Sequence, residues 1–244
     1  MIRVGSIQYK DGKQQPHPTY PNYIPVVVMT ASSKYWNLSP YNLRNSQGVI
    51  MENEWQFSKV YEEVPKISKQ ENRYSKRIIW QHPKETHYNP KTNKFTPEYL
   101  KWRQKGFKTQ DPIRYPVGWT HRHKCLFATV ETDPIVKLDY VESRKEIYLP
   151  IYCRLVKEQQ QFKDLKKMLS EGKNLLILEV DGPHQESLPY YKSTYSVQDD
   201  FIDQGSIEVN LENMKIMLND PKHAFGHGYC LGLALSDLDQ KVVQ

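Results

Sequence analysis

The sequence predicts a single α+β domain, residues 1–244, in which helices predominate. Amphipathic periodicity predicts helices at 162–170 and 211–219, and short apolar runs predict buried strands at 26–29 and 175–180. A chain of 244 residues can bury a sizeable core, and its 38% apolar and 25% charged residues exclude a disordered chain. We therefore expect one globular domain that combines both kinds of element.

Local start and stop signals place the other elements. Pro97 begins a helix that Gly106 should end, and Pro65 should end an earlier helix. Pro150 interrupts a helical pattern over 142–161, so a kinked helix and two separate helices both remain open. Further helices are expected at 52–64, 97–105 and 230–238, and further strands at 125–130 and 207–209.

The composition also predicts where the protein resides. No apolar run approaches the roughly 20 residues that span a bilayer, and Met1–Val4 carries no apolar signal-peptide core. The three cysteines are too few, and odd in number, for a disulfide scaffold. We expect a cytoplasmic, reducing environment and no membrane partner, and the oligomeric state stays open.

Basic and aromatic residues are concentrated in 66–124, which we interpret as an insertion wrapped on the core. The chain carries 34 Lys and Arg against 28 Asp and Glu, a formal charge of +6. The basic residues of the segment are Lys66, Lys69, Arg73, Lys76, Arg77, Lys84, Lys91, Lys94, Lys101, Arg103, Lys105, Lys108, Arg114, Arg122 and Lys124. Its aromatic residues are Tyr74, Trp80, Tyr88, Phe95, Tyr99, Trp102, Phe107, Tyr115 and Trp119. Such a mixture suits a nucleic-acid or nucleotide surface, unless the rings fill a core while the lysines face solvent.

The stretch from Glu52 to Lys59 combines an acid, an aromatic ring, an amide and an amine. In a helix, Glu52, Trp55, Gln56 and Lys59 would share one face. Burying a carboxylate and an amine is costly unless the site uses them. The alternative is an ordinary amphipathic helix with a peripheral ion pair.

This stretch resembles the signature helix of the NADAR superfamily of N-glycosidases, which includes ADP-ribosyl-guanine hydrolases. That family has a Glu, an aromatic residue three positions later, then a Gln, and a Lys three positions further. The residues in register here are Glu52, Trp55, Gln56 and Lys59. Upstream, Leu38-Ser39-Pro40-Tyr41 and then Gly48 are similar to the family's approach to this helix.

A second block is also similar to the family. Leu165, Leu169 and Gly172 lead into a strand that ends at Glu179. Then come Asp220, the segment Phe225-Gly226-His227-Gly228, and Leu231-Gly232. The chain departs from the family where Phe225 replaces a tryptophan, in the long stretch between Glu179 and Asp220, and in the unmatched insertion 66–124. The resemblance covers about half of the chain.

The resemblance implies cleavage of an N-glycosidic bond, which passes through a positively charged ribosyl centre. A carboxylate can stabilise that charge or activate water, or a neutral lysine can attack C1′ and form a Schiff base. The catalytic residues that it implies are Glu52, Lys59 and Asp220. The substrate-binding residues are expected to be Trp55, Gln56, Asp181, Phe225, Gly226, His227 and Gly228. From the residues alone, Asp181 could equally be a turn residue and the Gly226–Gly228 turn could be structural.

No metal or cofactor is expected. His121-x-His123-x-Cys125 and His223-x3-His227-x2-Cys230 offer enough zinc ligands, but neither spacing matches a common zinc finger. The chain also lacks the Gly-x-Ser-x-Gly, Walker and Rossmann patterns.

The sequence therefore predicts an enzyme that hydrolyses the base–ribose bond of an ADP-ribosylated or otherwise modified nucleotide or nucleic acid. The alternative is a non-enzymatic nucleic-acid-binding protein that uses the basic aromatic 66–124 surface. A nucleobase-modifying transferase is a third possibility. The choice among free nucleotide, RNA and DNA stays open.

Overall fold

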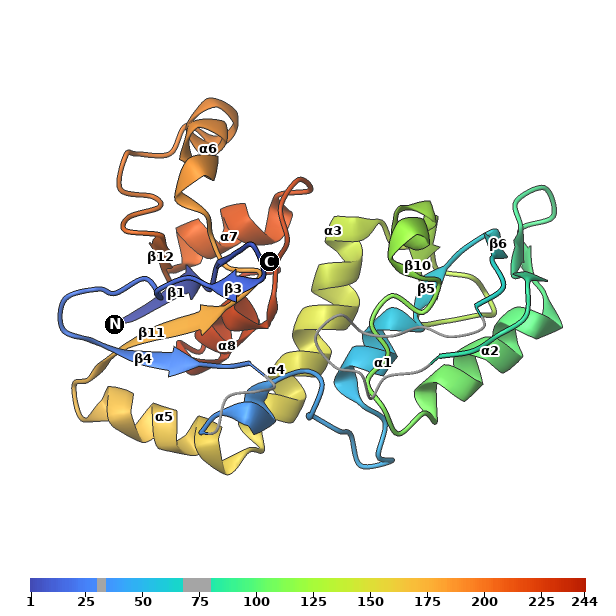
Figure 1. Ribbon diagram of the computed structural model, residues 1–244, viewed down its shortest axis with the longest axis horizontal. Coiled ribbons are helices and arrows are strands. Elements are labelled where there is room, and N and C mark those ends of the chain that lie inside the picture. The colour runs from blue at the N-terminus through green and yellow to red at the C-terminus, as the bar shows by residue number, and fades with distance from the viewer. Residues whose placement is uncertain (30–33, 68–79) are drawn as a thin grey trace. The chain divides into compact units, whose positions relative to one another are not determined.

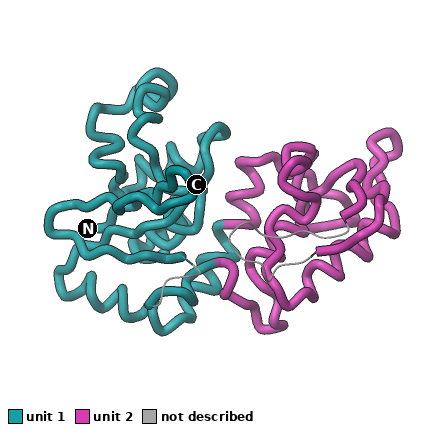
Figure 2. Tube along the Cα trace, in the orientation of Figure 1, with its two compact units in different colours: residues 1–39, 149–244 teal, residues 40–148 magenta. Residues whose placement is uncertain are grey.

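Figure 1 shows a computed structural model of the chain, which describes residues 1–29, 34–67 and 80–244. Backbone contacts divide the chain into two compact units, coloured separately in Figure 2: unit 1 (residues 1–39 and 149–244) and unit 2 (residues 40–148). The presence of both strands and helices confirms the α+β class. That helices predominate, and that the chain is a single domain, stay predictions. Within the described residues, no helix is long and apolar enough to cross a bilayer.

Unit 1 is built on a four-stranded sheet with strand order β12–β1–β11–β4. Its strands are β1 (Ile2–Ser6), β4 (Tyr23–Val27), β11 (Asn174–Glu179) and β12 (Ser206–Glu208). β11 runs parallel to both β1 and β4, and β12 runs antiparallel to β1. Val4 of β1 lies opposite Ile177 on one side and Ile207 on the other.

Both faces of this sheet are covered. Helices α8 and α5 pack on one face, and α4 packs against α8. On the other face, Leu176, Leu178 and Ile7 pack with Tyr20 and Tyr23. A parallel strand covered on both sides is apolar throughout, which explains the continuous run of β11.

The helices of unit 1 are α4 (Leu149–Lys157), α5 (Gln160–Ser170), α6 (Leu188–Tyr195), α7 (Leu211–Asn219) and α8 (His227–Leu235). Its smaller elements are the hairpin β2 (Tyr9–Lys10) and β3 (Lys13–Gln14) and the 3-10 turns Trp36–Leu38 and Gln185–Ser187.

Most elements predicted in unit 1 are confirmed within one to two residues. The Asn210 side chain caps α7 by accepting from the Asn213 N–H at 2.9 Å, and Gly172 follows α5 with φ +80°. The helix expected at 230–238 is wrong at its start, because α8 begins at His227 and includes part of the expected turn. Pro150 does not begin a separate helix, because the residues directly before α4 are also helical.

Unit 2 combines short helices with two-stranded ribbons. Its helices are α1 (Met51–Gln56), α2 (Pro97–Phe107) and α3 (Tyr140–Ser143), with a π-helical segment Arg144–Tyr148 and a 3-10 segment Trp119–Lys124. The ribbons pair β5 (Lys59–Val60) with β10 (Phe127–Ala128), β6 (Glu63–Val64) with β7 (Glu85–Thr86), and β8 (Tyr88–Asn89) with β9 (Lys94–Phe95).

Aromatic rings form the core of unit 2. Phe57 lies between Trp80 and Trp102, with ring centroids 4.8 Å and 4.7 Å away. A Cβ on Gly106 would stand 2.2 Å from the Phe57 ring. Gly106 therefore does not end the helix, as the sequence suggested, but allows α2 to pass close to Phe57 and continue to Phe107.

The helix predicted over 52–64 is too long, because α1 ends at Gln56. Beyond it, Lys59 and Val60 leave the helical path to pair with Ala128 and Phe127. The β-branched Val60 is fully buried in the aromatic core, where a strand packs it better than a helix would.

Candidate functional site

A row of three hydrogen-bonded side chains joins α1 to β5 in unit 2. Gln56 Nε2 donates to Glu52 Oε1 at 2.9 Å, and Lys59 Nζ donates to Gln56 Oε1 at 3.0 Å. Glu52 and Gln56 lie four residues apart, on the same face of α1. Both are buried, whereas Lys59 is half-buried and is the most exposed member of the row.

The surroundings of Lys59 shift its amine toward the neutral form. Burial lowers the pKa of Lys59 below its ordinary value, and the positive charge of Arg114 acts in the same direction. A thiolate at Cys125 and the Glu52 carboxylate would each raise the pKa of Lys59, but they do not outweigh burial. The Trp55 ring centroid lies 4.9 Å from Nζ and also favours the ammonium form. The net result is an amine that is nucleophilic at lower pH than a free lysine.

Asn53 fixes α1 to the segment that carries Arg114. Its side-chain nitrogen donates to the carbonyl oxygens of Thr109 at 3.2 Å and Asp111 at 2.9 Å. Its side-chain oxygen accepts from the Ile113 N–H at 2.7 Å. Because Asn53 is fully buried, these bonds hold the residue next to Arg114 in a fixed position against the helix.

A buried carboxylate–imidazole pair lies at the carboxyl end of β11 in unit 1. Glu179 accepts from His227 Nδ1 at 2.9 Å and from the Gly228 N–H at 2.8 Å. His227 Nε2 lies 2.8 Å from the Val28 carbonyl oxygen, so each ring nitrogen faces an acceptor. Burial opposes a charged ring, but the Glu179 charge and these hydrogen bonds raise the pKa of His227 above its ordinary value.

Gly226, which is predicted to contact a ligand, packs against this carboxylate. A Cβ on Gly226 would stand 2.3 Å from Glu179 Oε1. Phe225 is buried and stacks on Tyr229 with ring centroids 5.1 Å apart. In the described structure, the Phe225–Gly228 segment therefore packs against Glu179 and supplies two of its hydrogen-bond donors, the His227 ring and the Gly228 N–H.

A second buried carboxylate in unit 1 organises several donors. Asp220 accepts from Tyr190 Oη at 2.8 Å, Tyr191 Oη at 2.9 Å and the Lys222 N–H at 3.0 Å. His223 Nδ1 lies 2.6 Å from Asp220 Oδ2. Burial alone would raise the pKa of Asp220, but these hydrogen bonds hold it below its ordinary value.

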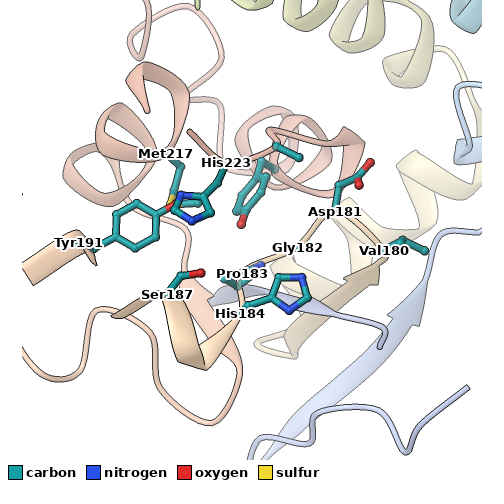
Figure 3. A pocket seen from close by; sticks show the side chains of 11 residues that line it. Val180, Asp181, Gly182, Pro183, His184, Ser187, Tyr191, Met217 and His223 are labelled. Carbon is teal, nitrogen blue, oxygen red and sulfur yellow. The ribbon is translucent and has the colours of Figure 1, made fainter. Parts of the chain in front are cut away.

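His223 and Asp181 both line a small cavity beside this cluster (Figure 3). The other labelled lining residues include His184, Ser187 and Tyr191, which come from the segment after β11 and from α6. The cavity has a volume of about 90 Å³. That is smaller than the roughly 300–1,000 Å³ of typical ligand pockets, so it suits water or a small polar group.

The structure brings together one set of predicted site residues in each unit. Glu52, Trp55, Gln56 and Lys59 meet in unit 2, although Lys59 reaches the group from a strand. Unit 1 holds Asp181, Asp220, Phe225, Gly226, His227 and Gly228.

Several residues of these clusters escaped sequence reasoning. Glu179 had a usable signal, since it is a carboxylate at the end of a buried strand, where α/β sheets place functional groups. Arg114 and Cys125 carry no such signal in the sequence, because only the tertiary fold brings their side chains near Lys59.

The stacking surface expected over 66–124 is wrong for most of the described rings. Trp80, Tyr88, Tyr99 and Trp102 are buried in the core of unit 2 and cannot stack on bases. Trp119 differs most from these rings, with 56% of its surface exposed. Lys69, Arg73, Tyr74, Lys76 and Arg77 lie outside the described residues.

Across residues 1–29, 34–67 and 80–244, no group of three or more His, Cys, Asp or Glu side chains is placed to hold a metal ion. No family model, curated protein or solved structure matched the chain. The resemblance to the NADAR superfamily therefore rests on the sequence motifs alone and stays a prediction.

Proposed function

We propose that this chain is an N-glycosidase with a NADAR-like, predominantly helical fold. Its substrate is an ADP-ribosylated or otherwise modified nucleotide or nucleic acid, in which it cleaves the base–ribose bond. The observation that carries the proposal is the half-buried Lys59 amine at the end of a row leading to the buried Glu52. A peripheral ion pair would raise the pKa of the lysine, whereas the pKa of Lys59 is lowered.

The Lys59 amine, once it has lost its proton, is suited to attack C1′ of the ribose. A bond forms between Nζ and C1′ while the bond from C1′ to the base breaks, and the base leaves with the bonding electrons. The attacking nitrogen then loses a proton, and the departing base gains one. Opening of the sugar ring gives a Schiff base, which water hydrolyses to return the amine.

Glu52 supplies negative charge near the position where the ribosyl centre becomes positive. Such fixed charges stabilise an oxocarbenium-like transition state. Gln56 orients both groups, because its amide nitrogen donates to Glu52 while its amide oxygen accepts from Lys59. In a second route, Glu52 activates water directly and no Schiff base forms.

Trp55 contributes to this site mainly by packing beside the Lys59 amine. Its ring is only 9% exposed, and it lies against the Tyr148 ring at 5.2 Å and the Lys59 amine at 4.9 Å. The proposal therefore uses Trp55 to shape the surroundings of Lys59 rather than to stack on the substrate.

The unit 1 clusters are given no bond-breaking role in this proposal. Asp220 accepts hydrogen bonds from tyrosines and from its own backbone segment, which makes it an organiser of His223. Its catalytic role, and the substrate contacts expected of Asp181 and His227, stay predictions.

The test is release of free base from ADP-ribosylated guanine, presented as a mononucleotide and within an oligonucleotide. Wild type is compared with Lys59→Arg, which keeps the positive charge but provides no neutral amine. The control is Lys137→Arg, since Lys137 is exposed and its amine also lies over an aromatic ring, 5.3 Å from that of Tyr88. We expect wild type and the control to release base and Lys59→Arg to be inactive.

The rival reading, a nucleic-acid-binding protein without activity, predicts a different result. A binder would keep its affinity in Lys59→Arg, because the phosphate contact survives. Failure of wild type to release base from either substrate, together with salt-sensitive binding of nucleic acid, would favour that reading.

A further inference from the structure

A short surface segment of unit 2 combines aromatic rings with positive charge: Trp119 and Arg122 are exposed, and Arg114 and Tyr115 are half-buried. Residues 114–124 contain two arginines, one lysine and two histidines, but no acidic residue. Trp119, at the start of the 3-10 segment, is 56% exposed, unlike the buried tryptophans of the same unit. The segment thus differs from the aromatic core that surrounds Phe57.

The side chains of this surface form a layered arrangement. The Arg122 guanidinium lies 3.4 Å from the Trp119 ring centroid and donates to the Trp119 carbonyl oxygen at 2.7 Å. The Tyr115 ring meets the Trp119 ring edge-on at 4.8 Å, and the Arg114 guanidinium lies 4.8 Å from the Tyr115 ring. The hydrogen bond and the ring contacts hold Trp119 in place, so little side-chain freedom is left to lose on binding.

The same surface is connected to the Lys59 site. Arg114, at one end of the arrangement, is close enough to Lys59 for its charge to be felt there. At the other end the chain continues into β10, where the Leu126 N–H donates to the Val60 carbonyl oxygen at 2.8 Å. Ala128 then pairs with Lys59 itself. Both ends of the stacking surface are therefore anchored beside the strand that carries the amine.

Single-stranded nucleic acid is the ligand whose chemistry fits these features. Its bases expose faces that stack on indole and guanidinium planes, while its phosphates attract arginine and lysine. In a duplex the base faces are already stacked on one another, so an exposed tryptophan can contribute little stacking free energy to duplex binding. A free mononucleotide has one base and cannot occupy both the Lys59 site and the stacking surface.

We propose that Arg114, Tyr115, Trp119 and Arg122 form a binding surface for single-stranded nucleic acid. The surface holds bases adjacent to the nucleotide that the Lys59 site cleaves. This assignment rests on the proposed function, and it narrows the substrate from any modified nucleotide to one within an unpaired strand.

The first test measures binding of a fluorescein-labelled oligothymidylate by anisotropy. Trp119→Ala should weaken binding by about 5-fold to 100-fold, the usual effect of removing one stacking ring. Arg122→Ala should weaken binding and reduce the salt slope by about 0.7, as expected for one lost phosphate contact with a single strand. The matched control is Trp36→Ala, because Trp36 is 48% exposed in unit 1 and should not affect binding.

A duplex of the same length provides the second comparison. It should bind more weakly than the single strand, and Trp119→Ala should leave its affinity unchanged. Equal binding of duplex and single strand, or equal losses in Trp119→Ala and Trp36→Ala, would overturn the proposed surface. Thermal unfolding of each variant checks that the exposed substitutions leave the fold intact.

Measurements of kcat/KM on the two substrates distinguish a failure of the binding surface from a failure of the proposed function. Trp119→Ala should lower kcat/KM for the oligonucleotide substrate and leave that for the mononucleotide unchanged. If wild type cleaves both substrates and Trp119→Ala cleaves the oligonucleotide equally well, the surface is wrong and the proposed function stands. If nothing is cleaved but oligothymidylate binding still requires Trp119, the proposed function fails and the binding surface stands.

Discussion

In unit 1 the buried carboxylates of Glu179 and Asp220 accept hydrogen bonds from histidines and backbone N–H groups. In unit 2 the buried carboxylate of Glu52 is joined to a lysine through the amide of Gln56. The pKa shifts differ accordingly. His227 and Asp220 are both held in their charged forms, whereas Lys59 is shifted toward its neutral form.

The difference indicates how to tell a structural charge from a reactive one. A group whose partners stabilise its charge adds to stability and becomes less available for proton or bond transfer. A group whose surroundings oppose its charge costs stability and gains reactivity. By this criterion we expect the unit 1 pairs to act on stability and Lys59 to be the reactive group.

Removal of the amine should have the largest effect. Lys59→Ala should lower kcat/KM for base release by about 10³-fold or more, because the nucleophile is lost. Its melting temperature should not fall, since the lysine's charge is disfavoured where it lies. Steady-state assays and thermal unfolding check both expectations, with Lys137→Ala as the control. If Lys59→Ala were strongly destabilised but still active, Lys59 would be a structural group and not the reactive one.

Loss of the Asp220 carboxylate should lower the stability of the fold. Asp220→Ala leaves the hydroxyls of Tyr190 and Tyr191 without this acceptor and should cost about 2–4 kcal/mol of unfolding free energy. Denaturant titration measures the loss. Asp199→Ala is the matched control, because the Asp199 side chain is 87% exposed and pairs with Lys192 at the surface. If the two substitutions cost the same, Asp220 is not the structural organiser described here.

The imidazole of His227 should give unit 1 a distinct pH dependence. Because its folded-state pKa lies above the unfolded value of about 6.5, its stabilisation is fully present below pH 6.5 and is lost as the pH rises through the folded-state pKa. His227→Gln should therefore cost about 1.5–3 kcal/mol near pH 6 and less near pH 9. Urea unfolding at both pH values tests this, with exposed His17→Gln as the control. A loss that grows with pH would contradict the assignment.

The smallest effect is expected from the charge beside the lysine. Arg114 lowers the pKa of Lys59, so Arg114→Ala should raise that pKa and move the acid limb of the kcat/KM profile to higher pH. At neutral pH the mononucleotide substrate should be cleaved more slowly, because a smaller fraction of the amine is unprotonated. At a pH above the limb, the difference should disappear. A uniform loss at every pH would indicate that Arg114 binds substrate and does not tune the amine.

Local patterns predicted much of unit 1, because its elements are long and regular. The run Leu175–Leu178 and the capped helix after Asn210 are visible in the sequence. β1 was missed because Arg3 and Gly5 interrupt its apolar pattern, and only the structure shows that Arg3 bonds to Ser206 across the sheet.

Unit 2 was harder to predict, because its structure depends on contacts between residues that are far apart in the sequence. Helical spacing correctly grouped Glu52 with Gln56, but Lys59 joins them through a strand that depends on Phe127 and Ala128. Composition could not separate Trp119, which is exposed, from Trp80 and Trp102, which are buried. That distinction depends on which rings pack around Phe57.

The most direct test of the central claim is trapping of the Lys59 adduct. Wild type is incubated with ADP-ribosylated guanine nucleotide and sodium borohydride, and the modified peptide is then identified by mass spectrometry. We expect a ribosyl adduct on Lys59 that is absent from Lys59→Arg and present in Lys137→Arg. Base release without any trapped adduct, or an adduct on another lysine, would contradict it.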